Sequence, residues 1–350
     1  MADPVNKQSD LKRAFAEDGA RKTSIGGQAL IEGIMMRGST HWSVAVREPD
    51  GNIYTEEHEL TSGKEKHAWM KWPLVRGCVA LVESLGLGFK ALEIAAQHAF
   101  NESEGHDEQA AGEDGTASYD KTDACSSKEK ASEEFGKAEM TVSLVLGVLL
   151  GVALFIIVPA LLANLLIGDY DTNALAWNLV DGILRVAVFV FYVWLIGRMS
   201  DIKRMFAYHG AEHKTIHCYE HELELTPENA RSFPCLHVRC GTAFLIMVMI
   251  VAIILYSLVP LNPLLEYLGI TNSVAKFLLV IVVRLAFLPV IAGISYEITV
   301  KWAGAHPDNP LVKVLLWPGM QMQRLTTNEP DDDQLECAIV AMKMVLEHEQ

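Results

Sequence analysis

The chain has 350 residues, 50% of them hydrophobic, and a formal net charge of −15 at pH 7. This charge excludes nucleic acid as an expected partner, because binding to phosphates requires a basic surface. The hydrophobic residues are gathered in four long runs, so the length of the chain is no guide to its number of domains. The first 24 residues contain no apolar signal segment, and we expect the six scattered cysteines to be thiols or metal ligands rather than disulfides.

The N-terminal part of the chain predicts a disordered segment at 1–23 and then a small β element at 24–63. Hydrophobic and polar residues alternate in 43–47. A Pro-Asp-Gly turn follows this strand, and 52–60 is interpreted as a second strand that returns beside it.

Residues 64–100 predict an amphipathic or membrane-associated helix. Arg76, Glu83 and Lys90 recur every seven residues and leave a wide apolar face. We interpret this helix as lying on the membrane or packing against the helix bundle. Residues 101–137 contain almost no aliphatic side chains and predict a disordered acidic linker, because such a segment has little to bury.

Four apolar runs within residues 138–300 are long enough, or nearly so, to cross the ~30 Å hydrocarbon core of a membrane. They lie at about 140–167, 176–196, 242–259 and 274–294. We therefore predict an α-helical integral membrane protein with about four transmembrane helices, a small N-terminal β element and cytoplasmic helices. The alternative, a set of buried helices in a soluble domain, fits the length of these runs poorly.

Two of the runs contain an arginine, which is costly in a membrane and therefore marks a candidate functional position. Arg185 follows Asp181 by four residues, and we predict that the two form an ion pair within one helix. Arg284 has no acidic residue one turn away in its own run.

The charges between the runs predict the orientation of the chain. The connections at 168–178 and 260–272 contain no Lys or Arg, whereas both ends of 199–240 carry several. The positive-inside rule then places both termini and the 199–240 loop in the cytoplasm of a multi-pass plasma-membrane protein. The segment 301–350 is a cytoplasmic C-terminal segment, and its acidic stretch predicts the start of a final helix at 334–349.

The most informative stretch is AYHGAEHKTIHCYEHE at 207–222, in which four histidines recur at every fourth position. On a helix they form one stripe, and two neighbours at this spacing can share a zinc or iron ion. The stripe is roughly 18 Å long at 1.5 Å per residue, so the four side chains cannot converge on a single ion.

Several ligand groupings remain open. His209 and His213 flank Glu212 in the order His-x-x-Glu-His, which is typical of inverted zinc peptidases and makes Glu212 a candidate general base. His213 and His217 with Glu220 form a second grouping, in which Glu220 has that role. In a third grouping, His217 and His221 flank Glu220 in the order His-x-x-Glu-His. The alternative is a solvated helix face with incidental histidines.

Further candidates lie at the entrances and exits of the spans. His237 and Cys240, just before the third run, are placed to approach the histidine helix. Arg239 between them is equally well explained as an anchor at the membrane surface. Glu297 ends the fourth run on the same side of the membrane and is a remote candidate for a ligand or base.

The motifs GGQALIEGIMMRG, YHGAEHKTIHCYE, RCGTAFL, GISYE and QRLTTNEPDDDQLECAI resemble those of the YqhQ-like bacterial membrane proteins, known as domain of unknown function 1385. These proteins are sometimes catalogued as predicted metal-dependent enzymes. The resemblance implies a multi-span membrane protein and a shared polar set: Glu32, Arg37, His209, Glu212, His213, His217, Glu220, His237, Arg239, Cys240 and Glu297. The chain differs from the family pattern in two places, because His221 lies outside this set and Val238 replaces a proline.

Taken together, the motifs predict a cytoplasm-facing, metal-dependent hydrolase that requires a divalent metal. Two alternatives are a non-catalytic assembly or scaffold protein and a metal or haem handler. The bilayer is the expected partner, besides membrane or cytoplasmic proteins that the sequence does not identify.

The orientation gives a first testable prediction. Reporter fusions after the connections 168–178 and 260–272 should report an external location, and fusions near Glu224 and at the C-terminus a cytoplasmic one, because only the latter regions are rich in Lys and Arg. An external signal near Glu224 would contradict the placement of the histidines in the cytoplasm.

Overall fold

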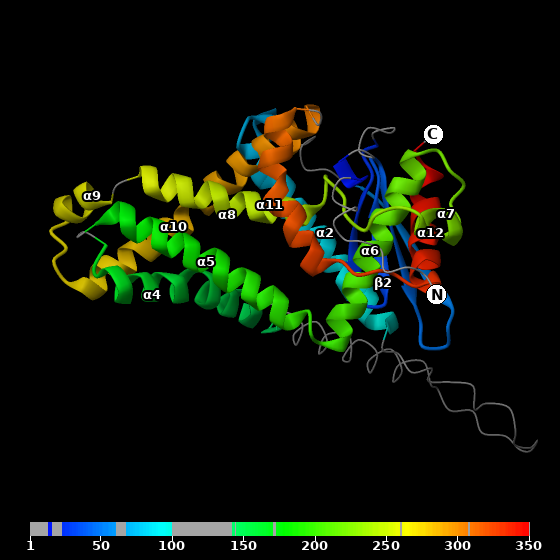
Figure 1. The fold of residues 1–350 in the computed structure, drawn as a ribbon, viewed down its shortest axis with the longest axis horizontal. Coiled ribbons are helices and arrows are strands. Elements are labelled where there is room, and N and C mark those ends of the chain that lie inside the picture. The colour runs from blue at the N-terminus through cyan, green and yellow to red at the C-terminus, as the bar shows by residue number, and fades with distance from the viewer. Residues whose placement is uncertain are drawn as a thin grey trace, which may run out of the picture. The chain divides into compact units, whose positions relative to one another are not determined.

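The computed structural model describes residues 13–15, 23–60, 68–99, 142–143, 145–170, 173–259, 261–306 and 309–349 (Figure 1). The predicted linker at 101–137 and most of the predicted disordered segment at 1–23 lie outside these residues. The chain forms two compact units, one made of residues 1–102 and 189–350 and the other of residues 103–188.

The N-terminal β element is a four-stranded antiparallel sheet, in which each strand pairs with the next along the chain. Its strands are β1 (Gly26–Leu30), β2 (Gly33–Arg37), β3 (His41–Arg47) and β4 (Ile53–Glu59). The sequence predicted only β3 and β4. The first hairpin was missed because its turn is formed by Glu32, with a φ of 49°, rather than by a glycine or proline pair.

The two faces of the sheet pack against different helices. On one face Trp42, Val44 and Val46 contact Ala91 and Ala95 of the long helix that follows the sheet. The other residues of β3 point the opposite way, as the two-residue period of a strand requires. That helix is α2 (Val75–Ala99), preceded by the short 3-10 helix η2 (Ala68–Lys71).

The opposite face of the sheet is covered by α6 (Ser200–Glu220) and α12 (Asp332–Leu346). Figure 1 shows both helices beside β2. The predicted final helix is therefore confirmed as α12. Asp331 caps it, because its side chain accepts a hydrogen bond from the amide of Gln334 while the Gln334 side chain accepts one from the amide of Asp331.

Within the described residues, four helical segments are long and apolar enough to cross a membrane, as predicted. At most 33% of the residues in their most apolar stretches are buried, so that large apolar side chains cover their outer surfaces. Such surfaces suit contact with lipid rather than water. The four segments are Val145–Ile167, Ala174–Ile196, Gly241–Leu258 and Ser273–Ala303.

The unit of residues 103–188 contains the first segment and most of the second. The first includes the π-helix η3 (Ala153–Ile157) and α4 (Val158–Ile167), and the second is α5 (Ala174–Ile196). The predicted ion pair is present, with 3.0 Å between Arg185 Nη2 and Asp181 Oδ2.

The other two segments belong to the larger unit and pack against each other through an apolar core. The guanidinium of Arg284 lies 4.7 Å from the centre of the Tyr256 ring and forms a cation–π contact. Sequence periodicity could not predict this contact, because the two residues belong to different helices. The third segment is α8 (Gly241–Leu258), and the fourth consists of α10 (Ser273–Tyr296) and the π-helix η4 (Glu297–Ala303). The described part of this unit also contains α7 (Pro227–Arg231), α9 (Asn262–Tyr267) and α11 (Pro310–Thr326).

The first half of α2 crosses α10 at two glycines. A Cβ atom on Gly77 would lie 2.8 Å from the Tyr296 Cβ atom and 3.0 Å from the Cα atom of Gly293. Backbones can approach this closely only where side chains are absent. The helix therefore packs against the bundle through its N-terminal half and against the sheet through its C-terminal half.

This crossing predicts a difference between two matched substitutions in α2. Gly86→Ala, at a position with open space around its Cβ, should stabilise the protein by up to about 1 kcal/mol through helix propensity. Gly77→Ala should lose that gain and cost about 1–3 kcal/mol through overpacking. Denaturation midpoints in detergent measure both, and equal midpoints would contradict the crossing.

Candidate functional site

The central helix of the larger unit, α6, is unusual because its polar side chains are buried. Glu212, His213, Lys214, His217 and Glu220 are each at most 5% exposed. The alternative interpretation of a solvated helix face is therefore wrong. Buried polar groups are costly unless they find hydrogen-bond partners, so that the surroundings of α6 must supply them.

Most of these partners come from the loop before α8. Lys214 Nζ donates to the carbonyl oxygens of Phe233, at 2.6 Å, and Arg231, at 3.0 Å. It also lies 2.8 Å from Glu329 Oε1. These bonds fix residues 231–240 along the buried face of α6, and they bring Cys240 to the histidines.

His209, His213 and Cys240 form one group, which we call the His209–His213–Cys240 group. One ligand atom of each lies within 4.8 Å of the others. His209 Nε2 is 3.1 Å from the Cys240 sulfur, and the His209 and His213 ring centres are 4.4 Å apart.

Backbone carbonyls determine which ring nitrogens carry protons in this group. His209 Nδ1 lies 2.8 Å from the carbonyl oxygen of Thr326, and His213 Nδ1 lies 2.6 Å from that of Cys235. A carbonyl can only accept, so each Nδ1 must donate. The neutral rings then carry their free electron pair on Nε2. In metal sites, a hydrogen bond from the other ring nitrogen to a carbonyl or carboxylate orients the ligating histidine in the same way. Among the described residues, His213 Nε2 is buried and has no hydrogen-bond partner.

The pKa shifts of two members of the group also favour metal binding. Burial lowers the pKa of His213 to about 4, so that its ring is neutral at neutral pH. Burial by itself would raise the pKa of the Cys240 thiol, but contacts with His213 and Thr242 outweigh it and lower that pKa overall. Neutral imidazole and thiolate are the forms that ligate transition metals.

Glu212 lies beside this group on the same helix. Burial raises its pKa to about 7, although His209 and a hydrogen bond to the Gly27 backbone act in the opposite direction. A Cβ atom on Gly27 would lie 2.9 Å from the Glu212 carboxyl carbon, so that only glycine leaves room for the carboxyl group at β1.

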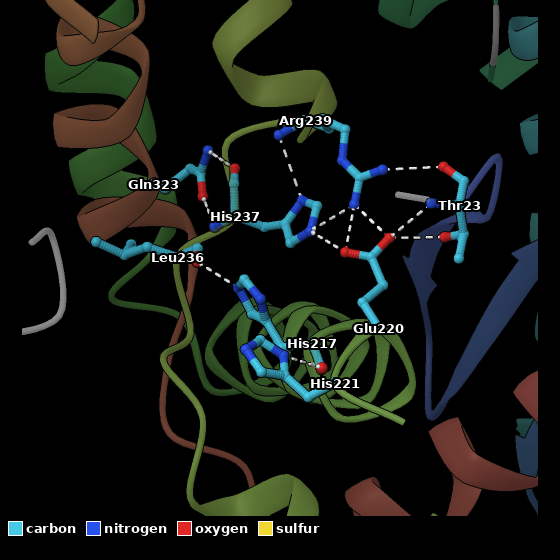
Figure 2. Close-up of polar contacts among 8 residues, drawn as sticks. All are labelled: Thr23, His217, Glu220, His221, Leu236, His237, Arg239 and Gln323. Carbon is cyan, nitrogen blue, oxygen red and sulfur yellow. Dashed lines mark hydrogen bonds and ion pairs between the residues drawn. The ribbon is translucent and has the colours of Figure 1, made fainter. Parts of the chain in front are cut away.

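Glu220 is held in a separate network two turns further along α6 (Figure 2). Both of its carboxylate oxygens accept from Arg239, and Oε1 also accepts from the Thr23 hydroxyl at 2.7 Å. Burial would raise the pKa of Glu220, but contacts with His237 and Arg239 lower it to about 2. The residue is therefore an ionised anchor for the Arg239 side chain.

His217 points its ring toward the same loop. Its Nε2 atom lies 3.0 Å from the Leu236 carbonyl oxygen, so that the proton is on Nε2 (Figure 2). Its buried Nδ1 atom has no hydrogen-bond partner within the described part of the chain. His221 bonds to the His217 carbonyl at 2.7 Å. Neither residue belongs to the His209–His213–Cys240 group.

His237 lies between the two networks. Its ring centre is 5.6 Å from that of His213 and 4.6 Å from that of His217, and its Nε2 is 3.8 Å from Glu220 Oε2. Burial lowers the pKa of His237 to about 3, so that its ring is neutral, and its Nδ1 atom accepts a hydrogen bond from the Arg239 amide. Gln323 fixes its backbone through two hydrogen bonds of 2.9 Å (Figure 2).

The remaining sequence candidates lie outside these networks. Glu297 accepts hydrogen bonds from Arg76 of α2. Glu32 accepts two from Arg204 at the start of α6, at 2.6 and 2.5 Å. Arg37 is the last residue of β2.

Some contributors to the site were missed by the sequence reasoning. Thr23 and Gln323 bind Glu220 and His237, but neither stands near a histidine in the sequence. The carbonyl oxygens of Cys235 and Thr326 orient the rings of His213 and His209, and sequence cannot reveal them because every residue has a carbonyl oxygen.

Comparison with known proteins agrees with the motif resemblance. Residues 72–348 match the model of a family described as a protein of unknown function, DUF1385. The chain is also 32% identical to the uncharacterized protein YqhQ of Bacillus subtilis (strain 168) over 321 residues, 92% of each chain. No solved structure matches it. Because the family model covers most of the chain, this protein belongs to the DUF1385 family.

Proposed function

We propose that this protein is a membrane-bound, metal-dependent hydrolase whose divalent metal is held by His209, His213 and Cys240. The observation that carries the proposal is the convergence of two oriented imidazoles on a half-buried thiol, with ligand atoms within 4.8 Å of one another. Two nitrogens and one sulfur suit zinc best, and iron second.

Three protein ligands are typical of catalytic zinc sites, in which a fourth position is left for water or substrate. When bound, such a metal supplies a water molecule of lowered pKa and polarises a substrate oxygen. Structural zinc sites normally use four protein ligands. The three-ligand set therefore supports an enzyme over a scaffold or a metal handler.

Glu212 has the role of general base in this proposal. Its carboxyl group is buried beside the metal ligands, and a pKa of about 7 allows it to accept and return a proton near neutral pH. Glu220 is less suited to this role, because its oxygens accept from Arg239 and Thr23. We propose that Glu220 positions Arg239 and, because the two residues are consecutive, also positions Cys240.

We further propose that the site faces the cytoplasm. The proposal is supported by the Lys and Arg residues around 199–240 and by their absence from the two connections on the other side. A cytoplasmic location also suits a free thiol, since that compartment keeps cysteines reduced.

Metal content gives the direct test of this centre. The detergent-purified protein should contain zinc or iron at a one-to-one ratio. His213→Ala and Cys240→Ser should each lose it, because each removes one of three bonds to the ion. His221→Ala, on the same helix but outside the group, is the matched control and should retain the metal.

His217→Gln separates this centre from the alternative pair of His213 and His217. The variant should keep the metal, because the His217 proton is on the nitrogen that faces Leu236. Elemental analysis decides between the two groupings. Loss of metal in His217→Gln together with retention in Cys240→Ser would refute the His209–His213–Cys240 group.

The role of Glu212 is tested by Glu212→Gln. This variant should keep its metal but hydrolyse a panel of p-nitrophenyl esters and bis(p-nitrophenyl) phosphate about 10²–10⁴-fold more slowly, because the proton acceptor is missing. His221→Ala should react at the rate of the unaltered protein. Equal rates in Glu212→Gln and the unaltered protein would exclude Glu212 as the base.

A further inference from the structure

A cavity of about 390 Å³ lies beside the proposed metal centre, within the larger unit. Its walls come from α2, α8, η4 and α11, and Cys240 forms part of one wall. Its volume is in the range of small-molecule binding sites. The lining is predominantly apolar.

The cavity exists because its walls carry small side chains. Gly77, Ala80 and Ser84 line it from one face of α2, at helical spacing, and Ala243 and Ala303 contribute from α8 and η4. The π-helical geometry of η4 widens the backbone at this point, and such turns are frequent at functional sites. Apolar space of this size that stays empty is costly, because the lining atoms lose their contacts.

The outer surfaces of the same walls are apolar as well. On α2, Val82 is 69% exposed, and on α11, Val314 is 71% and Trp317 53% exposed. In water these side chains would form an unfavourable surface, whereas in a bilayer they contact lipid tails. The two candidate membrane spans that line the cavity lead to the same conclusion. These features support a position of the cavity at the depth of lipid chains.

Ser84, Tyr296 and Thr299 also line the cavity, but its charged side chain and its thiol, among the described lining residues, are at the start of α8, where the third span begins. Arg239 and Cys240 lie there, directly before Gly241. A molecule with an apolar chain in the cavity would thus have its polar end at the proposed metal centre.

We propose that the cavity binds one acyl chain of a bilayer lipid and that lipids are the substrate class of this protein. The assignment of a substrate rests on the proposed hydrolase, whereas binding of the chain rests on the cavity alone. The lipid chain lies among α2, η4 and α11, and the bond to be hydrolysed lies near Cys240.

The test uses the full chain reconstituted in vesicles of phosphatidylethanolamine and phosphatidylglycerol, extracted in detergent and weighed by native mass spectrometry. The unaltered protein should retain phospholipid at a one-to-one ratio. Ser84→Trp and Ala80→Trp should each lower the retained lipid roughly tenfold, because the indole occupies the space of the chain. Val82→Trp, on the outer face of α2, is the matched control and should retain it.

Metal analysis of the same samples separates the two proposals. Ser84→Trp should keep its metal while it loses the lipid, and Cys240→Ser should lose its metal while it keeps the lipid. Ser84 is exposed at the cavity, so that its substitution leaves the helix core intact. Retention of detergent alone, or equal lipid in Ser84→Trp and Val82→Trp, would overturn the cavity proposal. Absence of metal with lipid retained would overturn only the metal centre.

Discussion

The burial of a polar helix is the constraint on which the rest of this structure depends. The middle of α6 carries carboxylates, imidazoles and a lysine that are removed from water between a β-sheet and two loops. Every such group needs a partner, and a single orphaned one costs about 1–3 kcal/mol. The loop 231–240 and the segment 326–329 supply backbone carbonyls that accept from Lys214, His213 and His209, and a carbonyl is an acceptor of fixed direction.

The hydrogen bonds of these buried polar groups also determine the geometry of the candidate site. Carbonyls that accept from Nδ1 of His209 and His213 fix the tautomer of each ring, so that the free electron pair of each ring is on Nε2. The ion pair of Glu220 with Arg239 fixes the residue before Cys240. A buried ion pair adds little net stability, but it specifies one arrangement of the loop.

The site also joins the two environments of the larger unit. Cys240 is the N-cap of α8, so that the last residue of the loop directly precedes a candidate membrane span. The crossing of α2 and α10 at Gly77 and Gly293 brings the helix that covers the sheet into contact with the bundle. A polar centre and an apolar cavity can therefore share the wall that contains Cys240.

Several features followed from the sequence because they depend on local or one-dimensional patterns. The four apolar segments, the ion pair of Asp181 with Arg185 and the final helix with its acidic start are set by hydropathy and helical spacing. The grouping of His209, Glu212 and His213 followed from the same spacing, with His213 in two of the candidate ligand sets. Membership in the DUF1385 family followed from motifs distributed along the chain.

Other features were decided only by the tertiary structure. Helical spacing places His213 equally close to His209 and to His217, and no pattern in the chain distinguishes the two pairs. The distinction comes from the carbonyl oxygens of Cys235, Leu236 and Thr326, which hold the rings in different orientations. The association of Cys240 with these histidines depends on a loop whose path is fixed by Lys214. Sequence periodicity specifies which residues share a face of one helix. The orientation of each imidazole ring depends instead on backbone carbonyls, which are distant in the chain and identical in every residue.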